Sequence, residues 1–183
     1  MPTLHFVRHG ETDWNREGRI QGVADVPLSA LGREQAEKLA ATLGTRQIGT
    51  LYSSDLRRAL ETAEPLAERL GLPIQPTPAL RERNFGANES RIAVEVAAEF
   101  GKEVGTRWLG PDERHPGGES MREVYERVAT FLDELLEGLP ADEIALVTSG
   151  GPIRVGTAHL AGEPVETLVW RAFDNCSVTT VEV

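Results

Sequence analysis

The alternation of short apolar runs with helix-like segments constrains this fold more than any other feature of the sequence. The runs have the length of strands and lie at residues 4–7, 48–52, 144–148 and 178–183. The predicted helices lie at residues 29–44, 55–70, 92–100, 120–138 and 152–160. Strands that alternate with helices predict an α/β fold, a three-layer α/β/α sandwich with a mostly parallel central sheet.

The first two helices have recognisable boundary signals. Ser29 suits an N-cap, and Gly44 follows the last apolar residue of the first helix. Asp55 is expected to cap the second helix in the same way. Pro65 lies inside the second helical pattern and is expected to kink or break it, because proline removes a backbone hydrogen bond.

The later helices carry similar signals. Ser120 and Glu123 form the pattern of a capping box, which opens a helix that reaches Gly138. Pro152 suits the first position of the last helix, where a missing N–H costs nothing.

The remaining segments are expected to be irregular. Polar chain follows the first strand as far as residue 27, and residues 71–78 form a turn with a short extended piece. Residues 79–90 are too polar and too interrupted by glycine for a core element. Residues 101–118 are expected to form part of a cover over a cleft. The carboxyl ends of the strands are the expected place for a ligand.

Length and composition predict one domain over residues 1–183. A chain of this length with 40% hydrophobic residues can enclose one core, and it shows no internal repeat or linker. Cys176 is the single cysteine, which excludes an intramolecular disulfide and fits a reducing compartment. The first ten residues lack the long apolar core of a signal peptide, so a cytoplasmic location is predicted.

The charge balance restricts the partners. Acidic residues outnumber basic ones by 29 to 19, for a net charge of -10, which repels nucleic acid and anionic membrane surfaces. No stretch approaches the roughly 20 apolar residues of a membrane helix. We therefore expect neither nucleic acid nor a membrane as partner. An anionic ligand must be attracted locally, which makes clustered arginines informative.

His9 lies just past the first strand, between Arg8 and Gly10, where a sharp turn would place side chains in a cleft. An imidazole there can attack phosphorus when a backbone carbonyl keeps its other ring nitrogen protonated. Arg8 would neutralise phosphate oxygens. A lone histidine beside an arginine is more often a surface residue, so these residues by themselves leave both interpretations open.

A longer series of motifs accompanies this pair. It consists of RHGET at 8–12, WN at 14–15, QG at 21–22, LSALG at 28–32, YSSDLRRA at 52–59, LRE at 80–82, GGES at 117–120 and NCS at 175–177. In this ordered series, which spans nearly the whole chain, the sequence resembles the histidine phosphatase superfamily, which includes the cofactor-dependent phosphoglycerate mutases.

The resemblance implies that His9 is the nucleophile and that Arg8 and Arg58 hold the transferring phosphoryl group. A guanidinium can pair with two phosphate oxygens and stays charged at any working pH. Arg58 also lies at a predicted helix start, where the backbone dipole adds to its charge. Arg57 is expected to be a solvated residue of the helix surface.

Glu82 matches the family's acid, which protonates the leaving oxygen and later takes a proton from water. A carboxyl beside a dianionic phosphate holds its proton more tightly, because like charge raises its pKa. Asn15, Gln21 and Gly22 match further phosphate and substrate contacts.

Ser149 departs from the family pattern, which places a second histidine immediately before Gly150. That imidazole stabilises charge as phosphorus becomes five-coordinate, whereas serine can donate one hydrogen bond without positive charge. Backbone N–H groups of the Gly-Gly turn remain available to an anion, so Ser149 and Gly150 are predicted to contact substrate. The loss of one donor is expected to cost roughly a hundred- to a thousandfold in rate.

The chain has three further histidines. His5 and His159 are expected to be structural, while His115 lies in the cover segment and is a minor candidate for reaching the cleft. A second departure lies at residues 88–90, where relatives often carry an aromatic residue, an acid and a glycine. This change is expected to alter the wall of the pocket and with it the substrate.

The sequence as a whole predicts hydrolysis of a small phosphorylated metabolite through a phosphohistidine, without a metal or a cofactor. The stretch between Glu82 and Ser120 is short for the insertions of mutase-type relatives, which favours hydrolysis over phosphoglycerate mutase-type transfer. A phosphate-ligand binding protein that has lost turnover is the alternative from another class. Nucleoside, sugar and glycerate phosphates and α-ribazole phosphate all stay open as substrates, as does an oligomeric state.

Overall fold

The computed structural model describes residues 2–101, 110–138 and 143–183. Their strands form one five-stranded sheet with the order β3-β2-β4-β1-β5. The strands are β1 (Thr3–Arg8), β2 (Ile48–Ser54), β3 (Ile74–Thr77), β4 (Glu143–Thr148) and β5 (Val178–Glu182). All neighbouring pairs are parallel except β1 with β5. The predicted α/β fold with a mostly parallel sheet is therefore confirmed.

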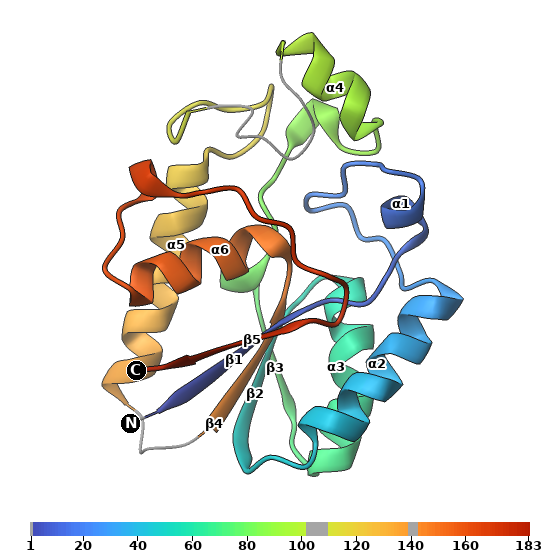
Figure 1. Cartoon of the computed structure of the whole chain (residues 1–183), viewed down its shortest axis with the longest axis vertical. Coiled ribbons are helices and arrows are strands. Elements are labelled where there is room, and N and C mark those ends of the chain that lie inside the picture. The colour runs from blue at the N-terminus through green and yellow to red at the C-terminus, as the bar shows by residue number, and fades with distance from the viewer. Residues whose placement is uncertain (1, 102–109, 139–142) are drawn as a thin grey trace.

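Two helical layers enclose the sheet (Figure 1). On one side lie α2 (Ala30–Leu43) and α3 (Arg57–Leu70), and on the other lie α5 (Met121–Glu137) and α6 (Gly150–Leu160). Successive side chains of a strand point to opposite faces, so β4 contributes to both cores. Ile144 and Leu146 belong to the core with α5, whereas Ala145 and Val147 belong to the core with α2 and α3.

The two central strands end together. Arg8 at the end of β1 is paired with Thr148 at the end of β4. The backbone N–H of His9 donates to the Thr148 carbonyl at 2.8 Å, one residue beyond the strand. His9 and Ser149 consequently leave the sheet side by side, although 140 positions separate them in the chain.

Several boundary predictions are confirmed. The Ser29 side chain accepts from the Gly32 N–H, and α2 ends at Gly44. Ser120 and Glu123 form both hydrogen bonds of a capping box, and α5 ends at Gly138.

Three boundary predictions need correction. The predicted cap Asp55 does not cap α3, which begins after Leu56 without a side-chain cap. Asp55 instead accepts two hydrogen bonds from Arg81, at 2.7 and 2.6 Å, because a fixed guanidinium fork outcompetes a single backbone N–H. The helix α3 continues through Pro65 without a break. Pro152 occupies the third position of α6, not the first, because the helix already begins at Gly150.

The loops contain short elements that the sequence did not predict. The helix α1 (Asp13–Arg16) lies within the predicted loop before residue 27, and its Thr12 cap forms a capping box with Asn15. The 3₁₀ turns are η1 (Pro78–Leu80), η2 (Gly86–Asn88) and η3 (Val165–Thr167). The prediction that residues 79–90 avoid the core is wrong for Leu80, which is fully buried in the core with α5.

The segments beyond the carboxyl ends of the strands include α1 and α4 (Ala93–Glu99) (Figure 1). The helix α4 confirms the helix predicted at residues 92–100. Of the predicted cover at 101–118, residues 102–109 lie outside the described residues, and residues 110–118 form turns. Within the described ranges, none of the helices combines the length and the apolar character that crossing a bilayer requires.

Candidate active site

His9 is 3% exposed at the carboxyl end of β1. Its Nδ1 lies 2.7 Å from the Gly10 carbonyl. Because a carbonyl oxygen can only accept, Nδ1 carries the proton and Nε2 keeps its lone pair. Burial lowers the pKa of His9 well below 6.5, and the charges of Arg58 and Arg8 lower it further. The imidazole is therefore neutral at ordinary pH, with one nitrogen available as a nucleophile.

The sharp turn after His9 depends on Gly10. A Cβ at this position would lie 2.6 Å from the carbonyl oxygen of Gly32 in α2. The glycine thus allows the chain to pass close to α2 while it turns away from the sheet. The same turn places the carbonyl of Gly10 against the imidazole.

Arg58 lies in the first turn of α3 and is 1% exposed. Its terminal nitrogens donate to the carbonyls of Ala24 at 2.9 Å and Gly22 at 2.6 Å. Its Nε is buried and has no partner among the described residues. Burial lowers the pKa of Arg58 to about 10, so the guanidinium stays charged at neutral pH. Arg57, by contrast, is exposed and pairs with Glu61, as expected for a solvated surface residue.

Arg8 is held by the last segment of the chain, because its guanidinium donates to the carbonyl of Phe173. Burial lowers its pKa, and Glu82 and Asp174 oppose that shift. The position of this arginine therefore depends on residues that lie 165 positions away.

Glu82 is held by two backbone donors. Its Oε1 accepts from the N–H of Arg83 at 2.8 Å, and its Oε2 accepts from the N–H of Gly151 at 3.0 Å. A Cβ on Gly151 would lie 2.1 Å from Oε1 of Glu82, so a larger residue at this position would displace the carboxylate. The start of α6 thereby places a carboxylate beside Ser149 and Gly150.

Asn15 and Gln21 come from the segment around α1. Oδ1 of Asn15 accepts from the Thr12 N–H at 3.1 Å and from Nδ2 of Asn175 at 3.3 Å. Nδ2 of Asn175 also donates to the His9 carbonyl at 2.9 Å, which connects Asn15 to His9. Gln21 is 8% exposed, and its Oε1 has no partner among the described residues.

Ser149 is the N-cap residue of α6 and is 3% exposed. Its side chain makes no capping hydrogen bond to the helix, in contrast to Ser29 and Ser120. The hydroxyl is thus not committed to the helix that it precedes.

One cavity of about 350 Å³ collects these side chains. All nine residues predicted for the site contribute to its lining: Arg8, His9, Asn15, Gln21, Gly22, Arg58, Glu82, Ser149 and Gly150. They come from the ends of β1 and β4, the start of α3 and the loops beyond the sheet. The structure therefore brings them together, while their chemical roles stay predictions.

The other histidines do not contribute to this cavity. His5 is fully buried within β1, as expected, and His159 pairs with Asp133 at 2.7 Å on the outer side of α6. His115 is 1% exposed and packs against the rings of Phe85 and Phe100, so it belongs to the cover and not to the lining.

The environment of His115 keeps its ring neutral. Oδ1 of Asn88 accepts from Arg91, which leaves Nδ2 of Asn88 to donate to Nδ1 of His115 at 2.8 Å. A protonated ring cannot accept that bond. Burial, with a contribution from Arg83, lowers the pKa of His115 to about 4.

Sequence reasoning missed part of the lining. Arg83, Arg154, Trp170, Arg171 and Phe173 also contribute to the cavity. Arg154 had a usable signal, because it lies four positions after Gly150 and one helical turn returns a side chain to the same face. Trp170 could be considered for a cleft as a tryptophan, although tryptophan more often packs in a core, whereas Arg171 and Phe173 had no signal because they lie in an irregular segment. Among the described residues, no group of three or more His, Cys, Asp and Glu side chains could hold a metal.

Comparison with known proteins assigns the family. The model of the histidine phosphatase superfamily (branch 1) matches residues 4–183. The chain belongs to this superfamily. Similar proteins include a probable phosphoglycerate mutase GpmB of Escherichia fergusonii, 37% identical over 185 residues, a match that covers 100% of this chain and 85% of that relative.

Solved structures of the same superfamily fold are similar over almost the whole chain. A mycobacterial glucosyl-3-phosphoglycerate phosphatase, solved with VO3, superposes with a TM-score of 0.88 at 34% identity, covering 100% of this chain and 93% of that one. YhfR of Bacillus stearothermophilus superposes with a TM-score of 0.84 at 30% identity, covering 100% and 92%. The relatives thus carry the names of phosphatases as well as mutases, which supports a phosphatase-type enzyme.

Proposed function

We propose that this histidine phosphatase superfamily member hydrolyses a small phosphorylated metabolite through a phosphohistidine on His9. The observation that carries the proposal is the state of the imidazole: Nδ1 is committed to the Gly10 carbonyl, and the ring is kept neutral in a cavity beside two guanidinium groups. A neutral nucleophile with a fixed tautomer next to unpaired positive charge suits attack on an anionic phosphorus centre.

In the first step, the Nε2 lone pair of His9 forms a bond to phosphorus as the P–O bond to the leaving group breaks. Arg8 and Arg58 stabilise the phosphoryl oxygens, because charge-assisted hydrogen bonds strengthen in a dry cavity. The carboxyl of Glu82 gives its proton to the leaving oxygen, which departs as an alcohol. Asn15, Gln21 and Gly22 contact the phosphoryl group or the rest of the substrate.

In the second step, water attacks phosphorus and gives a proton to the carboxylate of Glu82. The P–N bond breaks, the electron pair returns to Nε2, and inorganic phosphate leaves. Backbone N–H groups hold Glu82 beside the start of α6, so one carboxyl can serve both proton transfers.

We propose further that Ser149 occupies the place of the second family histidine. It lies at the end of β4, adjacent to the end of β1 and buried in the lining of the same cavity. Its uncommitted hydroxyl and the N–H of Gly150 can each donate one hydrogen bond to a phosphoryl oxygen. Neither brings a positive charge, so turnover is slower than a second imidazole would allow.

Hydrolysis is favoured over mutase-type transfer by the short stretch between Glu82 and Ser120, although several relatives are named as probable phosphoglycerate mutases. A protein that binds phosphate esters without turnover is the alternative from another class. The carboxylate of Glu82 speaks against it, since a pure anion-binding site gains nothing from a negative charge in its lining.

The test is to quench a reaction with a generic phosphomonoester and to assay the chain for acid-labile phosphate. We expect the label on His9 in the wild-type protein and none in His9→Ala, which loses essentially all turnover. Label on another residue, or undiminished turnover in His9→Ala, would contradict the mechanism. Stoichiometric binding of the ester without label or hydrolysis would favour the binding protein.

A further inference from the structure

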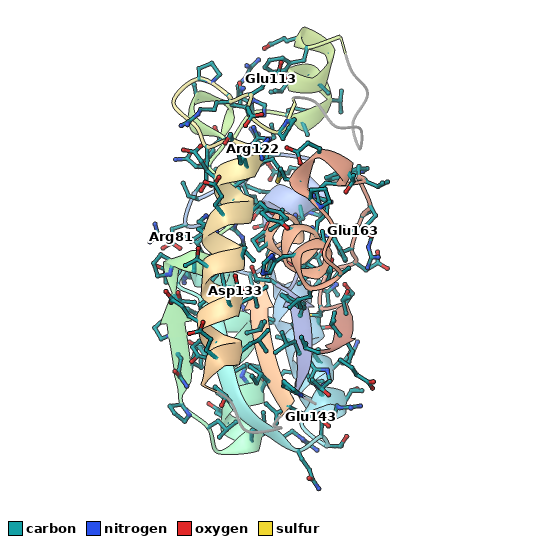
Figure 2. All side chains as sticks on the ribbon, turned by 90° about the vertical axis from the view of Figure 1, so that its left-hand side faces the viewer. Arg81, Glu113, Arg122, Asp133, Glu143 and Glu163 are labelled. Carbon is teal, nitrogen blue, oxygen red and sulfur yellow. The ribbon has the colours of Figure 1, made fainter. Side chains whose placement is uncertain are left out.

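Arginines inside and outside the cavity are neutralised differently. On the surface most arginines form ion pairs with carboxylates, including Arg81 with Asp55 and Arg122 with Asp112 and Glu166. Figure 2 shows where Arg81 and Arg122 lie on the molecule. Among the described residues, the arginines without a carboxylate partner are Arg8, Arg58, Arg69, Arg83, Arg154 and Arg171. All of these except Arg69 line the cavity.

This distribution is unexpected in a chain with ten more acidic than basic residues. Carboxylates are abundant, yet among the described residues a single one, Glu82, lines the cavity. Arg58 and Arg154 are buried, and unpaired charge at a buried site is unfavourable, so their presence indicates that a ligand supplies the missing negative charge. One phosphoryl group at His9 would neutralise Arg8 and Arg58, whose charges lower the pKa of His9. Arg83 donates to the backbone carbonyls of Glu119 at 2.8 Å and Glu113 at 2.9 Å, which gives it a structural role. Arg154 and Arg171 remain to be explained.

Arg154 and Arg171 contribute two further guanidinium groups to the lining. Arg154 projects from α6 and is 9% exposed, and it donates to the backbone carbonyl of Arg171 at 2.8 Å. Its Nε is buried without a partner among the described residues. Burial lowers the pKa of Arg154, Glu82 opposes that shift, and the nearby charge of Arg171 adds to it.

Aromatic rings hold both guanidinium groups in place. The Arg154 guanidinium carbon lies 4.3 Å from the centre of the Trp170 ring, and that of Arg171 lies 4.7 Å from the centre of the Phe173 ring. Stacking on a ring fixes the plane of a guanidinium while it leaves the N–H edge free for an oxyanion. Two like charges are thus held near each other without a carboxylate between them.

We propose that Arg154 and Arg171 form a second anion site in this cavity, which binds a carboxylate or second phosphate of the substrate while the phosphoryl group lies at His9. The proposal rests on the proposed function, and it narrows the substrate to a phosphomonoester with a second acidic group. Glu82 lines the same cavity, and its charge opposes the lowering of the pKa of Arg8 and Arg58 as well as that of Arg154.

Binding to the His9→Ala chain tests this site without turnover. Calorimetry would compare 3-phosphoglycerate with glycerol 3-phosphate, and glucose 1,6-bisphosphate with glucose 6-phosphate. Each pair differs in a second anionic group, a carboxylate in the first and a phosphate in the second. We expect at least one pair to show about 10- to 100-fold tighter binding of the more highly charged ligand, the range for a charge-assisted contact. The ligand pair with the larger ratio of affinities shows whether the second site prefers a carboxylate or a phosphate.

The variants separate a binding role from a structural one. Arg154→Gln in the same background should remove most of this preference, while it weakens glycerol 3-phosphate by no more than about threefold. Arg171→Gln, at an exposed residue whose loss does not disturb the core, should reduce the preference by a smaller factor. Arg69→Gln is the matched control, since Arg69 is exposed and unpaired but lies outside the cavity lining, and it should leave the preference unchanged.

Equal affinities within both ligand pairs would overturn the proposal. So would an Arg154→Gln variant that weakens all four ligands by the same factor, because that result indicates a structural role for the stack. Wild-type hydrolysis of the four esters is measured in parallel. Absence of hydrolysis contradicts the proposed function. The ratio of the two affinities within each ligand pair tests the second anion site.

Discussion

His5 lies within β1 and His9 immediately follows this strand; both are buried, and they have opposite environments. At the amino end of the sheet, His5 has both ring nitrogens engaged, Nδ1 with the Thr180 hydroxyl at 3.0 Å and Nε2 with the Glu143 carboxylate at 2.9 Å. At the carboxyl end, His9 has one engaged nitrogen, and its nearest charges are positive. Burial is common to both histidines, so burial does not distinguish a structural imidazole from a chemical one.

The polar residues around His5 and around His9 differ in the same way as the two histidines. Near His5, Arg46 and Glu143 form an ion pair, and hydrogen bonds from Arg46 and His5 lower the pKa of Glu143. Near His9, Arg58 has only carbonyls as partners and Ser149 leaves its helix uncapped. The last residues of parallel strands lie at one edge of the sheet. Beyond this edge, polar groups find hydrogen-bond partners in loops and not in neighbouring strands. The difference teaches that unsatisfied polar groups mark the functional end.

The largest effect that would sharpen this contrast is expected for Glu82→Gln. The amide keeps the shape of the carboxyl but cannot give its proton to a leaving oxygen, so kcat for an alkyl phosphate should fall about 100- to 10,000-fold. With p-nitrophenyl phosphate, whose leaving group needs no proton, formation of the phosphoenzyme should fall far less. Equal losses for both esters would contradict the role of Glu82 as acid.

A gain is expected for Ser149→His at the same end. The imidazole adds a donor with positive charge for the five-coordinate phosphorus, and kcat should rise about 100-fold. Circular dichroism and the free energy of unfolding check that the fold is retained. Unchanged turnover in a folded variant would show that Ser149 does not face the reacting phosphoryl group.

The smallest effect on turnover is expected for His5→Asn, which is compared with the same substitution at His9. His5→Asn loses contacts to Glu143 and Thr180, which should lower the free energy of unfolding by about 1–3 kcal/mol, measured by urea denaturation. Its kcat should stay within about twofold of the wild type. His9→Asn should abolish turnover with little loss of stability. Comparable losses of activity in both variants would break the contrast between the two ends.

Local sequence patterns predicted much of the secondary structure. Caps and periodicity located α2 and α5 to within a residue, because Ser29, Ser120 and Glu123 bond within a single helical turn. All nine site residues that the motif series predicts line one cavity. Their chemical roles stay predictions, as do the single domain, the partners and the location in the cell.

Two of the errors, at Asp55 and Leu80, arise from residues that are distant in the sequence. Asp55 was expected to cap α3, but the guanidinium of Arg81 takes its carboxylate. Leu80 lies in a polar, glycine-containing stretch, yet the packing of α5 against the sheet buries it completely. A sequence pattern shows which bonds a residue can form, and it does not show which competitor lies within reach.

Short-range order in this protein, then, can be derived from the chain alone: the alternation of strands and helices, most helix ends, and an imidazole between Arg8 and Gly10. The contacts between residues that are distant in the sequence cannot be derived in this way. The approach of Gly151 to Glu82, the anchoring of Arg8 by Phe173 and the stacking of Arg154 on Trp170 join segments that no local period connects. The free energy that selects these contacts arises from burial and charge in the completed fold, so tertiary structure decides them.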